Sequence, residues 1–72
     1  MTRNEFLIEL TAIIRASRPL TEDLSLDDIP EWDSLAAMST VSLFEEKLGK
    51  EIDLATIEKM TSVSDLIKAA GL

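Results

Sequence analysis

The amino-acid sequence predicts an all-α fold: a small four-helix bundle, its third helix short, with a long ordered loop between the first and second helices. Apolar residues recur at helical spacing in separate segments, and helix-capping residues precede those segments. Three aromatic residues and two glycines are too few for a β-sandwich or barrel, which needs many turns. The 72 residues suffice for one core, so we expect residues 1–72 to form a single domain.

The first helix is predicted to follow Thr2 and to end no later than Arg18. Thr2 and Glu5 fit a capping box, in which each side chain accepts a hydrogen bond from the other residue's backbone N–H. Arg15 and Arg18 lie near the expected C-terminal end, where the helix dipole favours positive charge, and Pro19 stops the helix. The apolar stripe of this helix comprises Phe6, Leu10, Ile13 and Ile14.

Residues 19–33 form a connection of fifteen residues that contains two prolines and six acidic residues. Connections of this length are usually functional or disordered, but regularly spaced apolar residues argue against disorder here. We expect an ordered loop whose apolar side chains pin it to the core: Leu20, Leu24, Leu26, Ile29 and Trp32. The acids lack the glycine and the twelfth-position glutamate of an EF-hand, which favours weak cation screening over a specific metal site.

The second helix is predicted to begin at Ser34 or Leu35 and to end before Gly49, which suits the left-handed position after a helix. Its apolar residues follow the helical period: Leu35, Met38, Val41 and Leu48, with Leu43 and Phe44 nearby.

The last two helices are predicted from their capping residues. Asp53 can cap a short third helix from Leu54 to about Met60, and Ser62 with Asp65 gives a second capping box. The fourth helix ends at Gly71, and its apolar residues are Val63, Leu66, Ile67 and Ala70.

The composition excludes most catalytic sites. The chain has no cysteine and no histidine, so Ser–His–Asp sites, Cys–His sites and thiolate metal sites are impossible. It has no phosphate-binding G-x-x-x-x-G-K-[ST] loop, and a paired-carboxylate hydrolase would need a buried carboxyl and a cleft that so short a chain hardly provides. We therefore expect a protein that is not an enzyme, in which a prosthetic group or a partner supplies any reactive atoms.

The charge and hydropathy patterns restrict the partners. Residues 19–58 hold eleven acids and two lysines, a charge of −9, and the rest of the chain holds +2, which gives the net charge of −7. This charge argues against nucleic acid and favours basic protein surfaces. No apolar run of about 18 residues predicts a membrane span, and no signal-peptide pattern is present, so we expect a soluble, cytoplasmic protein.

Ser34 has two interpretations from the residues alone. It can be the N-cap of the second helix, since serine is among the best capping residues. It can also be an attachment point, because a phosphodiester at a helix N-terminus meets free backbone N–H groups and the positive end of the dipole.

Asp33-Ser34-Leu35 resembles the D-S-L motif of the acyl carrier protein family, whose serine receives 4′-phosphopantetheine from coenzyme A. Segments 44–48, 51–52 and 57–63 are similar to the family's C-terminal half, so the resemblance covers essentially the whole chain. It implies that Ser34 carries the arm, whose thiol holds acyl groups as thioesters between biosynthetic enzymes.

The resemblance also implies roles for other residues. Asp33 would help a phosphopantetheinyl transferase to position coenzyme A and magnesium, and Leu35 would contact partner enzymes with basic docking surfaces. The expected docking residues are Leu35, Ala37, Met38, Glu31, Asp53 and Glu58. The expected lining of a pocket for the acyl chain is Met38, Val41, Phe44, Ile52, Ile57 and Met60. We expect the carrier to be a monomer.

One departure from the family concerns the helix after Ser34. Fatty-acid carriers usually place acids on its exposed face, whereas Ala36 and Ser39 stand here and the first acid is Glu45. This favours a specialised carrier of polyketide or related pathways over one of housekeeping fatty-acid synthesis. Two alternatives remain open: an aminoacyl or peptidyl carrier, and an unmodified acidic helical adaptor that binds a basic protein surface.

Overall fold

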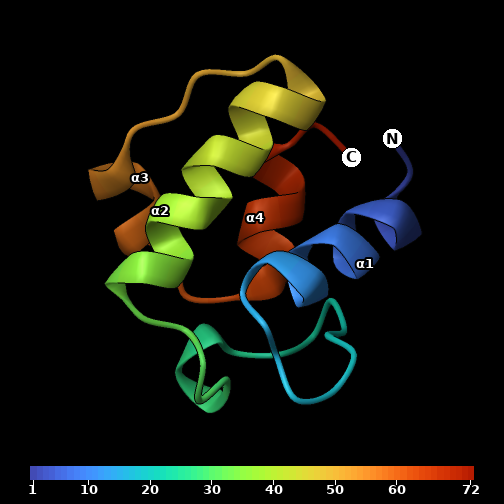
Figure 1. Ribbon diagram of the computed structural model, residues 1–72, viewed down its shortest axis with the longest axis vertical. Helices are drawn as coiled ribbons and strands as arrows, with labels where there is room; N and C mark the ends of the chain where they lie inside the picture. The colour runs from blue at the N-terminus through green and yellow to red at the C-terminus, as the bar shows by residue number, and fades with distance from the viewer.

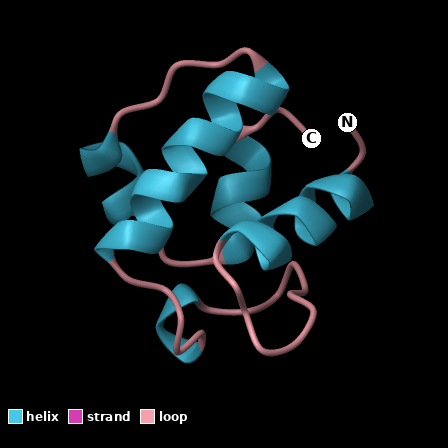
Figure 2. Cartoon of the chain, in the orientation of Figure 1, coloured by secondary structure: helices cyan, strands magenta, loops and turns pink.

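The computed structural model describes residues 1–72 and confirms the all-α prediction. Figure 1 shows α1 and α3 on opposite sides of α2, with the connection between α1 and α2 along one end of the bundle. Figure 2 shows helices and loops only. The four α-helices are α1 (Arg3–Ile13), α2 (Ser34–Leu43), α3 (Leu54–Glu58) and α4 (Val63–Ala69), and two short helical segments are η1 (Leu26–Asp28) and η2 (Phe44–Leu48).

The core consists of fifteen buried apolar residues drawn from the helices and from the long connection. The rings of Phe6 and Phe44 meet edge to face at its centre, with centroids 5.9 Å apart. The one buried polar residue, Thr40, donates a hydrogen bond from its hydroxyl to the carbonyl oxygen of Ala36 at 2.9 Å. This bond lets a hydroxyl lie in the core without a desolvation penalty for an unpaired group.

The long connection is ordered, as predicted. Leu20, Leu26 and Ile29 are buried, and Leu24 and Trp32 are half-buried against the core. The backbone also joins the start of α4: the N–H of Leu26 donates to the Thr61 carbonyl at 2.9 Å, and the N–H of Val63 donates to the Leu24 carbonyl at 3.0 Å. The sequence pattern did not predict this contact or the η1 turn.

Helix α1 ends at Ile13, within the predicted limit, and both arginines lie beyond the helix. Neither Arg15 nor Arg18 lies in the last turn. The chain leaves the helix through a Schellman motif, in which the N–H of Ala16 donates to the Thr11 carbonyl and the N–H of Arg15 to the Ala12 carbonyl. Arg15 occupies the left-handed position of this motif, with φ 57°, at a cost of roughly 1 kcal/mol relative to glycine.

The other helix ends follow the predicted caps. Asp53 accepts a hydrogen bond from the N–H of Thr56 at 2.7 Å and starts α3, which ends at Glu58, two residues before the predicted end. Gly49 has φ 63° and ends η2, the π-helical continuation of α2. The capping boxes of Thr2 with Glu5 and of Ser62 with Asp65 are both present. None of the helices is long and apolar enough to cross a membrane.

The capping carboxylates have lowered pKa values. Hydrogen bonds from the backbone N–H and the side chain of Thr2 lower the pKa of Glu5, and hydrogen bonds from Thr56 do so for Asp53. The backbone N–H of Thr61, which lies 3.0 Å from the carboxylate, is the main cause of the lowered pKa of Asp65. Because the folded state favours the charged form, these groups stabilise the fold above the unfolded-state pKa, about 4 for Asp and Glu.

We predict that this stabilisation disappears in acid. Asp65→Asn is expected to lower Tm at pH 7, and the difference from wild type is expected to vanish as the pH falls below about 4 through the lowered pKa of Asp65. Thermal unfolding, followed by circular dichroism between pH 7 and about pH 2, measures the difference in Tm between the variant and wild type. Asp27→Asn is the matched control, since Asp27 is exposed and caps no helix. A difference for Asp65→Asn that is independent of pH would contradict the account.

Candidate functional site

The start of α2 is built by Asp33, which is the N-cap residue. Its carboxylate accepts a hydrogen bond from the N–H of Ala36 at 2.8 Å, and its backbone is extended. Ser34 is therefore the first residue of the helix, and the interpretation of Ser34 as the N-cap is wrong. Two neighbouring residues both suit the cap, and the carboxylate of Asp33 takes the role because the helix starts at Ser34, one residue earlier than a cap at Ser34 would place it.

Ser34 is exposed, and its hydroxyl takes part in no hydrogen bond within the protein. The first backbone bond of the helix runs from the N–H of Ala37 to the Asp33 carbonyl at 2.9 Å. The N–H groups of Ser34 and Leu35 thus precede the helical ladder and remain available to an acceptor. A negative group on the Ser34 hydroxyl would lie beside these donors and at the positive end of the helix dipole.

Of the expected docking residues on α2, two are exposed and one is buried. Leu35 is 71% exposed and Met38 is 52% exposed, so two large apolar side chains on the same side of α2 face solvent. Ala37 is 1% exposed and Ala36 is 5% exposed, because both face the core. The expectation that Ala37 contacts a partner is therefore corrected: these alanines allow close helix packing inside the bundle.

The expected docking acids come from two parts of the chain. Glu31 is half-buried in the loop before α2, while Asp53 and Glu58 are exposed at the two ends of α3. The structure contains no group of three or more acidic residues arranged to hold a metal ion.

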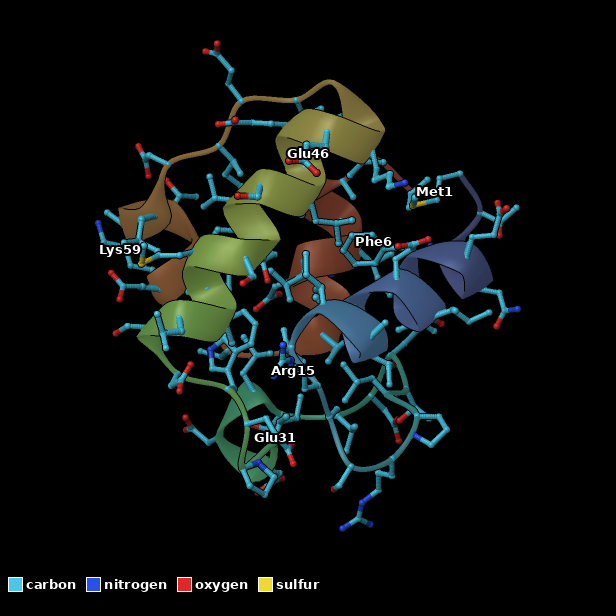
Figure 3. All side chains as sticks on the ribbon, in the orientation of Figure 1. Met1, Phe6, Arg15, Glu31, Glu46 and Lys59 are labelled. Carbon is cyan, nitrogen blue, oxygen red and sulfur yellow. The ribbon has the colours of Figure 1, made fainter.

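An open groove of about 750 Å³ runs beside α2, on the side of α1. Figure 3 shows two of the residues that line it, Arg15 and Glu31, near the start of α2. Arg15 follows the end of α1, and Glu31 belongs to the loop before α2. The groove is lined by Ile13, Ile14, Arg15, Glu31, Asp33, Leu35, Ala36, Met38, Ser39 and Ser42. Sequence reasoning assigned no role to Arg15 or Ser42 at such a site, since neither belongs to a motif.

The residues expected to line an acyl pocket differ in their burial. Phe44 and Ile57 are fully buried, whereas Met38 is exposed. Val41, Ile52 and Met60 are half-buried against the core. Helix α2, which holds Met38 and Val41, packs against α3, which holds Ile57. The role of the six residues in holding a chain stays a prediction.

The fold and the site define a class of protein: a small acidic helical bundle with an exposed serine at the first position of its second helix, beside exposed apolar side chains. A family model described as "Phosphopantetheine attachment site" matches residues 10–70, and the chain belongs to this family. Its members carry covalently bound 4′-phosphopantetheine, in agreement with the acyl carrier resemblance, and are typically carriers without catalytic activity. No solved structure matches the chain significantly.

Substitutions at Asp33 can separate its capping role from a role in modification. Asp33→Ala is expected to lower the free energy of unfolding by about 1 kcal/mol, because the N–H of Ala36 loses its acceptor. Asp33→Asn is expected to keep most of the stability, since asparagine caps as well as aspartate. Both variants are expected to accept the arm more slowly if the carboxylate helps the transferase.

Urea unfolding and the rate of phosphopantetheine transfer measure the two effects. Stability losses of equal size in both variants would contradict the capping role. Wild-type transfer rates in Asp33→Asn would contradict the role in modification.

Proposed function

We propose that the protein is an acyl carrier protein that holds acyl intermediates as thioesters on a 4′-phosphopantetheine arm attached to Ser34. The observation that carries the proposal is the exposed Ser34, with a free hydroxyl, at the first position of α2 and inside the family match. The rest of the chain supports a carrier without chemistry of its own, because it has no histidine and no cysteine.

The residues around Ser34 fit a covalently attached 4′-phosphopantetheine arm. The Ser34 hydroxyl is unobstructed, and the N–H groups of Ser34 and Leu35 can donate to the phosphodiester that joins serine and arm. The arm supplies the thiol that forms the thioester, and the protein has no thiol that could compete with it. The chain's own contribution is to fix the attachment point in space and to present it at an end of α2 that partner enzymes can reach.

Partner enzymes would dock on the outer face of α2. Leu35 and Met38 offer apolar contact area beside Ser34, and burial of exposed leucine and methionine side chains is the main source of binding energy available here. The acids Glu31, at the groove, and Asp53 and Glu58, at the ends of α3, would attract basic surfaces. The proposed partners are a phosphopantetheinyl transferase and the enzymes that load and process the acyl group, in the cytoplasm.

The pathway proposed is a specialised one, of polyketide or related type. Its support is the lack of acids on α2: Ser39 and Ser42 stand on the groove side, and the first acid after Ser34 is Glu45 in η2. An enzyme that recognises acids along this helix would find fewer of them than in a housekeeping fatty-acid carrier. The same face also suits an aminoacyl or peptidyl carrier, and the loading enzyme would decide between the two.

The proposal predicts that Ser34 alone gains the arm. After incubation with coenzyme A, magnesium and a phosphopantetheinyl transferase, intact-mass spectrometry is expected to show one phosphopantetheine on wild type and none on Ser34→Ala. Ser42→Ala is the matched control, because Ser42 is an exposed serine on the same helix, and it is expected to load like wild type.

An arm on Ser34→Ala, or no arm on wild type, would contradict the proposal. The second result would favour an unmodified adaptor, which binds its basic partner equally well with serine or alanine at residue 34.

A further inference from the structure

The groove beside α2 is lined by the chain neighbours of the proposed attachment point, though not by Ser34 itself. Asp33, Leu35 and Ala36 line it and flank Ser34 in the chain. Its α2 wall continues through Met38, Ser39 and Ser42, which share one side of the helix with Leu35. From Ser34 to Ser42 the helix rises about 12 Å, so a flexible group attached to Ser34 can lie along the groove.

The opposite wall comes from the end of α1 and contains Arg15, the only basic residue that lines the groove. The one ion pair in the structure joins Arg3 and Glu22, so the guanidinium of Arg15 has no carboxylate partner. Glu31 and Asp33 also line this part of the groove, and their charges repel an anion. A phosphodiester at Ser34 therefore needs a cation to offset them, and Arg15 is the one available.

Arg15 has a backbone conformation that is unfavourable for arginine. Its φ of 57° is a left-handed value that glycine adopts more easily than arginine does. The Schellman motif that imposes this conformation also turns the chain at the wall of the groove. A strained residue with an unpaired charge beside a proposed site points to a role for its side chain.

The lining contains apolar, hydroxyl and basic groups that suit the parts of the arm. Pantetheine follows its phosphate with a branched apolar carbon, a hydroxyl and two amides before the thiol. Leu35, Met38 and Ile13 offer apolar contacts, and the hydroxyls of Ser39 and Ser42 can hydrogen-bond to amides. In the core between α2 and α3, by contrast, Phe44 and Ile57 are fully buried. A chain that entered there would have to displace packed side chains.

We propose that the pantetheine arm rests in the outer groove between α1 and α2, with Arg15 against its phosphodiester, and not in the core between α2 and α3. This inference rests on the proposed attachment at Ser34. The resting arm covers Leu35 and Met38, the two apolar residues of the proposed docking face. A partner enzyme that docks on this face therefore displaces the arm and frees its thiol in the same event.

The absence of cysteine allows a direct test. The arm of the loaded protein carries the only thiol, so a maleimide nitroxide labels that position alone. Paramagnetic broadening of backbone amide signals then maps the arm, with the reduced nitroxide as the diamagnetic reference. Strong broadening is expected at residues 13–15 and 38–42.

Broadening centred on residues 52–60 would place the arm at α3 and overturn the inference. Broadening confined to the residues next to Ser34 would mean a solvated arm and would overturn it too.

Arg15→Gln tests the charge contact. It is expected to remove the broadening at residues 13–14 while leaving the intact mass of the loaded protein unchanged apart from the substitution itself. Arg18→Gln is the matched control, since Arg18 is exposed and lies outside the groove, and it is expected to retain the wild-type pattern. An unchanged pattern in Arg15→Gln overturns the role of Arg15.

Intact mass separates the two proposals. If the protein gains the arm but the broadening lies outside the groove, only the groove inference is contradicted. A protein that never gains the arm contradicts the proposed function, and the groove inference with it.

Discussion

The hydrogen bond from the N–H of Ala36 to the carboxylate of Asp33 determines the geometry of the whole site. It ends the long connection and makes Ser34 the first helical residue. The helical period then sets the direction of each side chain in the first turns: Ala36 and Ala37 face the core, while Ser34, Leu35 and Met38 face solvent. A helix that began one residue earlier or later would rotate its start by about 100° and would move Ser34 relative to the docking face.

Asp33 can cap α2 because the loop that precedes it is fixed to the rest of the structure. Ile29 is buried, Trp32 packs against the core beside it, and the backbone of residues 24–26 bonds to that of residues 61–63. The acidic loop is therefore a rigid support for the start of α2. Rigidity suits a carrier. When the attachment point is fixed, a partner enzyme has to position only the flexible arm. The groove inference adds that the resting arm and the partner compete for the same face.

Much of the fold could be predicted because its signals are local. Both capping boxes, the cap at Asp53 and the left-handed Gly49 depend on residues a few positions apart. The end of α1 could not be predicted, since nothing in the sequence indicates a left-handed arginine at residue 15. The orientation of α2 could not be predicted either: apolar residues lie on all its sides, so the pattern did not show that Ala37 points inward. The motif predicts Ser34 as the attachment point, but the groove joins segments distant in sequence and required the three-dimensional structure.

We infer that this protein acts through Ser34. The most direct measurement is tandem mass spectrometry of the protein purified from the cells that make it, without added transferase. We expect a phosphopantetheine on the peptide that contains Ser34, part of it extended by a group that hydroxylamine releases, since a thioester is cleaved in this way. Protein that is unmodified, or modified only at another residue, would contradict the claim.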